Sequence, residues 1–458
     1  MQAANDVRPF AGLHYDQRAV GSIGDCLTQP YDVISPSQQE DYYRRHPRNV
    51  IRLILNRGAP DNGAPDNRYA RAAGHLAEWK AAGVLRLRKE PAFWVYEQRY
   101  SLPWNGTELA THGFIGTVRL QDFDAGAILP HEKVMSGPIR DRLRLTSATH
   151  TQFESIWGFY HRPSSAAEVE LKKTMAGVPA INYSEPPASA GFAHVRHRLW
   201  CMDDPAACET VGRAVSAAPI YIADGHHRYQ TMLGYRDTMR RKRPAAGSQA
   251  PWEFIMMYLV NAAASELTIL PYHRLIHGLE SFRGDALLGR LEKRFALRRY
   301  SPDREEAFLR DLEKSSGPAF GALLAGSTAP LLLTLREPGR HAAGKAGRAS
   351  ELHSLLDVNV LNELILNDAL GISEERIARK SNIDYFDNPA EVMARVRGGR
   401  ADIGLLLRAP SLETVMKLSE LGEVLPRKST YFYPKPLSGL VFYPMDAESE
   451  APGPGNPL

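Results

Sequence analysis

The sequence has few cysteines and no long apolar run. Its three cysteines, Cys26, Cys201 and Cys208, cannot form a disulfide framework, and an odd number suits a reducing cytosol. The longest apolar stretch, Phe254–Val260, is far shorter than the roughly 20 residues that a membrane helix needs. The opening residues mix polar and apolar types and include Pro9, which is not typical of a secretion signal. We therefore expect a cytoplasmic protein that makes no membrane contact.

An excess of charge of one sign is also missing. Lys and Arg number 56 against 52 Asp and Glu, a net charge of +4, which is too balanced for a protein held to nucleic acid mainly by charge. Several standard motifs are absent, including Gly-x-Gly-x-x-Gly and Gly-x-Ser-x-Gly. The segment from Gly339 to Ala346 resembles a phosphate loop, but Ala346 stands where a Mg²⁺-binding Ser or Thr is required. With 43% hydrophobic and 24% charged residues, the composition is that of a globular protein.

Segments with strand and helix periodicity follow one another along the 458 residues, which predicts an α/β (α+β) fold with mixed sheets. Strands are expected at 49–55, 93–100, 113–120, 153–160, 192–202, 219–223, 254–261, 267–271, 330–335 and 402–407. Helices are expected at 69–85, 140–149, 166–176, 205–217, 225–243, 286–294, 358–370, 389–396 and 411–421. The tandem pentapeptide at 58–67 predicts a surface loop, 338–349 a flexible basic loop, and 446–458 a disordered tail.

The most informative local pattern is Asp224-Gly225-His226-His227-Arg228, which follows an apolar strand and begins a predicted helix. The first N–H groups of a helix are unpaired and its dipole is positive there, so this position favours an anion. Glycine lets a ligand approach the backbone closely, and an arginine can bind phosphate oxygens with two N–H groups. The aspartate is placed either to cap the helix or to hold a metal ion beside the phosphate. The alternative is an ordinary helix start with two surface histidines.

Other segments carry chemistry less specifically. His131 and Glu132 follow a predicted strand, and a carboxylate beside a histidine can act as a general base or metal ligand, or belong to a solvated turn. Two prolines bracket Asp32 in a rigid loop, either a fixed turn or the wall of a substrate site. Basic, hydroxyl and aromatic residues interleave between Pro426 and Lys435, a composition that suits either phosphate and base binding or a buried edge strand.

Several of these segments together resemble the domain-of-unknown-function family 1015. They run in order along the chain: Arg8-Pro-Phe, Pro30-Tyr-Asp-Val-Ile-Ser35, Leu129-Pro-His-Glu132 with Gly137-Pro138 and Asp141-Arg-Leu143, Asp224–Arg228, Ile269–Arg274, and Lys428–Lys435. The family looks like a distant relative of the ParB/sulfiredoxin-like group, whose members include free-serine kinases and CTP-binding ParB proteins. The resemblance implies one intertwined unit over 1–445, with a ParB-like core within 110–275.

The resemblance also implies roles for single residues. Gly225, His226, His227 and Arg228 would form a phosphate cup, with His227 counted among the catalytic residues. Asp224 would bind Mg²⁺ or the serine hydroxyl, and Glu132 would be the general base. Lys428 and Lys435 would neutralise the charge of the nucleotide. The implied reaction transfers a phosphoryl group from ATP or ADP to free L-serine with Mg²⁺, giving O-phospho-L-serine.

Two other functions stay open on the sequence alone. One is a nucleotide-binding regulator without turnover, by analogy with the ParB branch. The other is a metal-dependent hydrolase, which requires His131, Glu132, His226, His227 and His273 to meet in space.

Overall fold

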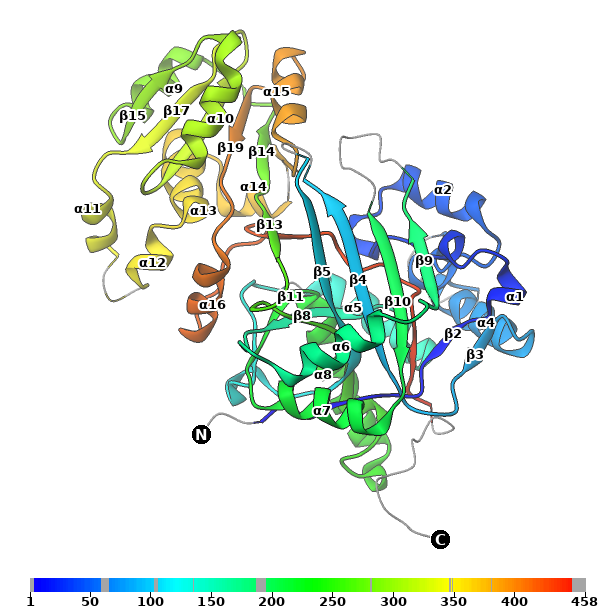
Figure 1. Ribbon diagram of the computed structural model, residues 1–458. Coiled ribbons are helices and arrows are strands. Elements are labelled where there is room, and N and C mark those ends of the chain that lie inside the picture. The colour runs from blue at the N-terminus through cyan, green and yellow to red at the C-terminus, as the bar shows by residue number, and fades with distance from the viewer. Residues whose placement is uncertain are drawn as a thin grey trace. The chain divides into compact units, whose positions relative to one another are not determined.

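A computed structural model describes residues 4–58, 66–102, 106–134, 136–186, 195–280, 282–345, 347, 349–379 and 381–446 (Figure 1). Its contacts divide the chain into two compact units. Unit 1 comprises 1–130, 134–267 and 434–458, and unit 2 comprises 131–133 and 268–433. Most of the tandem pentapeptide and nearly all of the predicted tail lie outside the described ranges. The expectation of one intertwined unit stays a prediction.

Unit 1 is built on a mixed sheet, which confirms the predicted class. Its strands run in the order β6-β11-β8-β12-β5-β4-β10-β9, with β1 added beside β5. β6 with β11 and β8 with β12 are parallel pairs, and the other pairs are antiparallel. The strands are β1 (Val7–Arg8), β4 (Phe93–Ser101), β5 (Glu108–Arg119), β6 (Ile128–Leu129), β8 (Ile156–Tyr160), β9 (Ile181–Ser184), β10 (Arg196–Met202), β11 (Ile220–Asp224) and β12 (Phe254–Asn261). Short pairs join β2 (Leu13–Tyr15) to β3 (Leu85–Leu87) and β7 (Thr151–Gln152) to β21 (Tyr443–Pro444).

The central strands of this sheet are covered on both faces. Every residue of β12 is buried, as its continuous apolar run predicts. β12 lies between β5 and β8, and β11 follows β8 toward the edge. The pairing of β11 with β8 shifts register between Ile222 and Asp224. Such a bulge bends the strand and redirects its last side chain, and here that side chain belongs to Asp224.

Helices of unit 1 pack on this sheet and on each other. They are α1 (Gln17–Val20), α2 (Pro36–Arg45), α3 (Ile51–Ile54), α4 (Arg68–Ala81), α5 (Ser136–Thr149), α6 (Ala166–Met175), α7 (Pro205–Ser216) and α8 (His226–Lys242). α6 packs on α7, β4 and β10, whereas α8 packs on α5 and β8. Tyr229, Met232 and Met239 of α8 enter the same apolar core as β12. This packing fixes the direction of α8 and therefore the position of its first turn.

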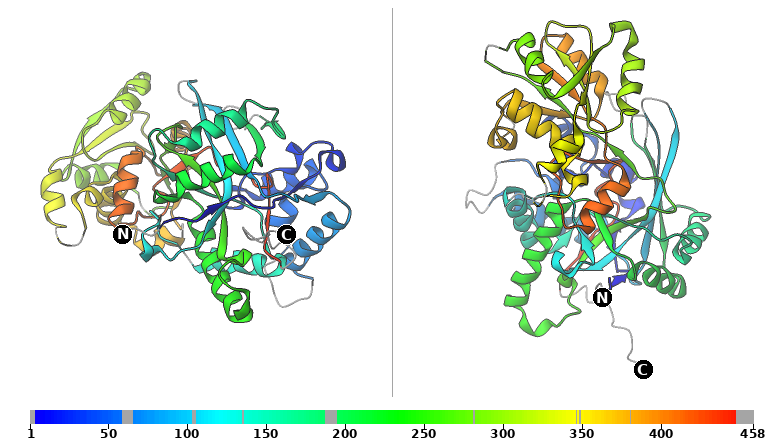
Figure 2. Two further views of the ribbon diagram at one scale, coloured as in Figure 1. Left: turned by 60° about the horizontal axis from the view of Figure 1, so that its bottom comes forward. Right: turned by 90° about the vertical axis from the view of Figure 1, so that its left-hand side faces the viewer.

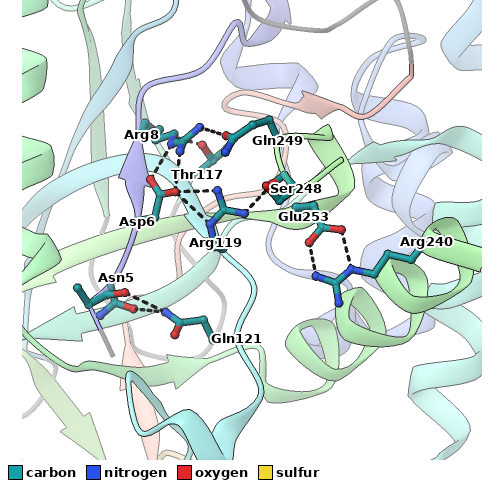
Figure 3. Close-up of polar contacts among 11 residues, drawn as sticks. Asn5, Asp6, Arg8, Thr117, Arg119, Gln121, Arg240, Ser248, Gln249 and Glu253 are labelled. Carbon is teal, nitrogen blue, oxygen red and sulfur yellow. Dashed lines mark hydrogen bonds and ion pairs between the residues drawn. The ribbon is translucent and has the colours of Figure 1, made fainter. Parts of the chain in front are cut away.

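Ion pairs fasten the first strand and the end of α8 to the body of unit 1 (Figure 3). Asp6 accepts hydrogen bonds from Arg8 Nε at 2.6 Å and pairs with Arg119 Nη2 at 2.9 Å. Arg240, in the last turn of α8, binds Glu253 through two N–H groups at 2.8 and 2.5 Å. Because Glu253 is buried, this bidentate pair anchors the far end of α8.

Unit 2 is built on an antiparallel sheet in the order β15-β17-β16-β19-β14-β18. Its strands are β14 (His273–Ile276), β15 (Phe295–Arg299), β16 (Ala319–Leu324), β17 (Leu331–Leu335), β18 (Ile383–Phe386) and β19 (Ile403–Leu406), and β13 (Thr268–Leu270) pairs separately with β20 (Tyr431–Tyr433). Its helices are α9 (Gly284–Leu291), α10 (Glu305–Glu313), α11 (Pro338–Ala343), α12 (Glu351–Ser354), α13 (Asp357–Val360), α14 (Glu374–Arg379), α15 (Pro389–Arg397) and α16 (Leu412–Glu420). Figure 2 shows helices against this sheet.

Alternation along the strands of unit 2 separates two apolar cores. On β17, Leu332 packs with α10 and α15, whereas Leu331 and Leu333 pack with α9 and the 358–372 segment. Side chains of successive strand residues point to opposite faces of a sheet, so each core covers one face.

Two predictions of local structure are wrong, and a third is confirmed with a different type of helix. The predicted strand 49–55 contains α3, because a short buried apolar run suits a helix as well as a strand and Asn49 Oδ1 accepts the N–H of Ile51 at 2.9 Å. The predicted flexible loop 338–349 begins with α11, since Pro338 is favourable at a first helical position. The predicted helix 358–370 is helical, but Leu361–Ala369 adopts π-helical hydrogen bonding.

Candidate functional site

The centre of the candidate site is the junction between β11 and α8. Asp224 ends the strand, and Gly225 follows with a φ of 99°, in the left-handed region that favours glycine. α8 then begins at His226, and Gly225 offers no side-chain cap to the helix. The predicted strand, turn and helix are therefore confirmed, and the helix dipole is directed toward this turn.

Arg228 returns from the first turn of α8 to the aspartate. Its Nη2 lies 2.7 Å from Asp224 Oδ2, and its Nη1 donates to the carbonyl oxygen of Ser155 at 2.7 Å. The guanidinium lies against the turn, so that a Cβ at position 225 would be 3.0 Å from Nη2. Burial lowers the pKa of Arg228, but the carboxylates of Glu154, Asp224 and Asp32 outweigh this effect and raise the pKa above its usual value.

Lys435 supplies a second cation to the same carboxylate. Its Nζ contacts Asp224 Oδ1 and lies 3.3 Å from Asp32 Oδ2. Only 4% of the lysine side chain is exposed, so the ammonium is held inside the polar cluster. Gln98 Nε2 on β4 donates to the carbonyl oxygens of Pro434 and Lys435 at 3.2 and 3.1 Å, which fixes the backbone behind the ammonium.

Other residues of this cluster were not among the site residues predicted from the sequence. Glu154 Oε1 accepts the N–H of Tyr31 at 3.1 Å and the hydroxyl of Ser438 at 2.9 Å. The guanidinium of Arg142 lies 4.0 Å from the centre of the Tyr31 ring. Burial is the main cause that raises the pKa of Tyr31 to about 12. The sequence marked the Asp32 loop as either a fixed turn or the wall of a substrate site, and Glu154 stands in no recognisable motif.

A small cavity borders this cluster. It has a volume of about 50 Å³, and its lining includes Arg142, Glu154 and Arg228. Such a volume admits a few water molecules. The charged groups therefore have solvent-sized space beside them, and Asp32, whose side chain is 38% exposed, leads from the cluster to the surface.

The two histidines of the motif differ in burial. His226 is buried and His227 is half-buried, and the carbonyl of His227 accepts the hydroxyl of Thr231 at 2.8 Å within the helix. Neighbouring side chains on a helix point in different directions, so the two rings do not act on one atom. The catalytic role of His227 stays a prediction.

Several predicted residues belong to unit 2 instead. Glu132 forms an isolated bridge with Leu425, and His131 Nε2 lies 3.0 Å from Thr430 Oγ1. Lys428 has a φ of 59°, and its Nζ donates to the hydroxyl of Tyr272 at 3.2 Å. The proposed roles of these residues stay predictions.

The side chains around Asp224 do not fit a metal ion held by the protein. Lys435 binds one of the carboxylate oxygens of Asp224, and Arg228 binds the other. Across the described ranges, no group of three His, Cys, Asp or Glu side chains is placed to hold a metal ion. Among these described residues, no such group includes His131, Glu132 and His273 of unit 2 or His226 and His227 of unit 1. What the cluster offers is two buried cations beside a helix N-terminus, an arrangement suited to an anion.

Comparison with known proteins identifies the family. The model of the family described as "Protein of unknown function (DUF1015)" matches residues 7–359, and the chain belongs to this family. None of the curated proteins matches the chain in sequence. In the described part of the chain, no helix combines the length and apolar character that crossing a membrane requires.

Solved structures are similar only distantly. A free serine kinase in complex with AMP is 14% identical, with a TM-score of 0.33, covering 69% of this chain and 86% of its own. A conserved hypothetical protein from Pyrococcus furiosus is 13% identical, with a TM-score of 0.33 and coverages of 71% and 92%. SbnI from Staphylococcus aureus, truncated at its C-terminus, is 9% identical, with a TM-score of 0.32 and coverages of 71% and 85%. At this similarity the neighbours say nothing specific about activity.

Proposed function

We propose that the protein is a small-molecule kinase that transfers a phosphoryl group from ATP or ADP to the hydroxyl of free L-serine. The observation that supports it is the double ion pair of Asp224, which holds Arg228 and Lys435 together at the start of α8. Phosphoryl transfer needs charge neutralisation and positioning more than covalent chemistry. The serine acceptor and the ParB-like core within 110–275 are taken from the motif resemblance in the sequence.

In this proposal the phosphate competes with Asp224 for the two cations. A terminal phosphate at the turn would accept hydrogen bonds from Lys435 and Arg228, while the close approach allowed by Gly225 brings it to the first turn of the helix. Asp224 then acts by holding the cations in place before the nucleotide arrives. This reduces the side-chain ordering that binding would otherwise require.

Asp32 is the carboxylate best placed to receive the proton of the serine hydroxyl. It lies on the same ammonium as Asp224 but is more exposed, 38% against 17%. A general base has to lie within hydrogen-bond reach of the group that it deprotonates, and a group beside the phosphate-binding lysine meets this condition. Glu132, the base inferred from the resemblance, stays an alternative, and mutagenesis of Asp32 and of Glu132 can distinguish between the two.

Mg²⁺ enters the proposal as the counter-ion of the nucleotide. Magnesium is usually held by substrate phosphates and only one or two carboxylates. Because both oxygens of Asp224 already bind cations, no step is assigned to an ion that the protein itself holds.

The test is direct. Purified protein is incubated with ATP or ADP, Mg²⁺ and L-serine, and phosphoserine is measured by mass spectrometry. Phosphoserine that depends on both nucleotide and protein is the expected result. Saturable nucleotide binding without phosphorylation of serine or another small alcohol would instead support a regulator without turnover, and would end the kinase proposal.

A further inference from the structure

A second group of reactive side chains lies in unit 1, and the proposed kinase does not use it. His112 on β5 has a hydrogen-bond partner at each ring nitrogen. Its Nε2 lies 2.9 Å from Glu168 Oε2 on α6, and its Nδ1 lies 2.9 Å from the hydroxyl of Ser265. The three side chains thus form a serine–histidine–carboxylate chain, the arrangement that activates a serine nucleophile.

The partners of His112 determine which nitrogen carries the proton. A carboxylate only accepts hydrogen bonds, so Glu168 fixes the proton on Nε2. Nδ1 is then left as an acceptor 2.9 Å from the Ser265 hydroxyl. The same hydroxyl accepts the backbone N–H of His112 at 3.2 Å and lies 3.0 Å from the carbonyl oxygen of His112, so Nδ1 and this carbonyl are its two acceptors. The side chains of His112 and Glu168 are 13% and 12% exposed, which limits competition by water for this contact.

The serine stands on a turn with a fixed backbone. The turn follows β12, and the N–H groups of Ala264 and Ser265 both donate to the carbonyl of Asn261 at 3.0 Å. Ala263 and Ala264 are exposed, whereas Ser265 is half-buried. Ser265 is therefore partly accessible to solvent, beside two small exposed residues.

A hydrogen-bond donor for a developing oxyanion lies next to the serine. The carbonyl of Glu266 accepts the hydroxyl of Thr111 at 2.7 Å, which fixes the peptide between Glu266 and Leu267. The N–H of Glu266 has no acceptor in the described part of the chain. In serine hydrolases, the N–H of the residue after the nucleophile is one of the groups that stabilise the oxyanion.

We propose that Ser265 is an activated nucleophile that accepts an acyl group from small activated esters. As Ser265 Oγ bonds to the ester carbonyl carbon, its proton moves to His112 Nδ1. The bond from that carbon to the leaving oxygen then breaks, and the leaving oxygen takes the proton from Nδ1. The products are acylated Ser265 and the free alcohol, with His112 returned to its starting form. Glu168 is a positioning residue that orients the ring and stabilises its charged form.

The experiment uses p-nitrophenyl acetate with the full chain. Release of p-nitrophenol is followed by absorbance, and the acetylated residue is located by peptide mass spectrometry. We expect one equivalent of rapid release and acetylation at Ser265, abolished in Ser265→Ala. His112→Asn should slow acetylation by about 10²-fold or more, the usual contribution of a general base. Glu168→Asp, which keeps the charge, should retain more of the rate than Glu168→Gln.

Ser327 provides a matched control. Its hydroxyl is also half-buried in a turn and contacts the N–H and carbonyl of one residue, Ala329, at 3.2 and 3.3 Å, but no histidine. Ser327→Ala should therefore leave the release unchanged. Acetylation elsewhere than at Ser265, or at an equal rate in a folded His112→Asn variant, would show that Ser265 only fastens the turn. Locating the acetylated residue in the wild-type protein tests the role of Ser265 even if a variant does not fold. This measurement does not depend on kinase activity.

Discussion

Asp224 and Lys435 are joined by a direct ion pair although 211 residues separate them in the sequence. The lysine is almost entirely buried, and its ammonium is shared with Asp32. Taking a lysine out of water is costly unless carboxylates compensate for the lost hydration. This pair therefore joins the C-terminal segment of unit 1, which contains Lys435, to the start of α8.

Replacing Lys435 tests the cation in the proposed reaction. Lys435→Met keeps the length of the side chain but removes its charge, and should lower phosphoserine formation by about 10²-fold or more, if the ammonium stabilises the transferred phosphoryl group. Lys173→Met, in an exposed pair with Glu170, is the control and should leave the rate unchanged. Initial rates of phosphoserine formation provide the measurement. Equal rates in both variants would show that Lys435 has no role in the reaction.

Replacing Arg228 tests the other cation through stability. Arg228→Ala leaves Asp224 without one of its two partners in a mostly buried cluster, and should destabilise the fold by about 3–5 kcal/mol. Arg213 forms an exposed pair with Glu209, also four residues away in the sequence, so Arg213→Ala should cost less than about 1 kcal/mol. Urea unfolding of both variants gives the comparison. Similar losses would mean that burial adds nothing to the Arg228 pair.

Adding a methyl group at Gly225 tests the left-handed turn. Gly225→Ala forces a residue with a Cβ into a φ of 99° and brings that Cβ to 3.0 Å from Arg228 Nη2, so it should destabilise the protein by more than about 1 kcal/mol. Gly234 lies in the same helix, where an added Cβ would have open space around it, and Gly234→Ala should be neutral or stabilising by up to about 1 kcal/mol. The melting temperature of Gly225→Ala should therefore lie below that of the wild-type protein, and that of Gly234→Ala should be equal to it or higher.

Comparing Asp32→Asn with Glu132→Gln identifies the base. If Asp32 receives the serine proton, Asp32→Asn should lower kcat by about 10²–10⁴-fold while nucleotide affinity changes little. Glu132→Gln should then retain its activity, because Glu132 would not be the group that takes the serine proton. Steady-state kinetics combined with calorimetric binding of ADP separate the two effects. The reverse pattern would return the role of base to Glu132.

His273 gives unit 2 a predicted dependence on pH. Burial, with a smaller contribution from Arg274, lowers the pKa of His273 to about 3, and its Nδ1 accepts the N–H of Leu407 at 3.2 Å. Below pH 6.5 the unfolded chain binds a proton that the folded chain refuses until about pH 3, so stability falls as the pH drops through this window. The slope should reach up to about 1.4 kcal/mol per pH unit.

His273→Gln should flatten this acid dependence, because glutamine can accept the same N–H but does not titrate there. Free energies of unfolding measured between pH 4 and pH 7 provide the test. An unchanged slope would show that other groups cause the loss of stability in acid.

Much of the local structure follows from the sequence because it depends on neighbours along the chain. The continuous apolar run of 254–261 predicts β12 with the bounds that the structure shows. The pattern around 219–228 predicts a strand, a glycine turn and a helix, since each has its own short-range signal. The wrong prediction of a strand at 49–55 also has a local cause. A short buried apolar run has no periodicity that distinguishes a helix such as α3 from a strand.

The sequence by itself thus determined the family motifs, the mixed α/β class and the turn that presents Asp224, Gly225 and Arg228. Only the tertiary structure decided which distant groups complete the site. It brought Lys435, Asp32 and Glu154 to that turn, and it placed Glu132 and Lys428 in unit 2. The same holds for Ser265, His112 and Glu168, which no motif connects. The physical reason is that the pairing of buried charges depends on which segments tertiary packing brings together, and separation along the chain does not encode this.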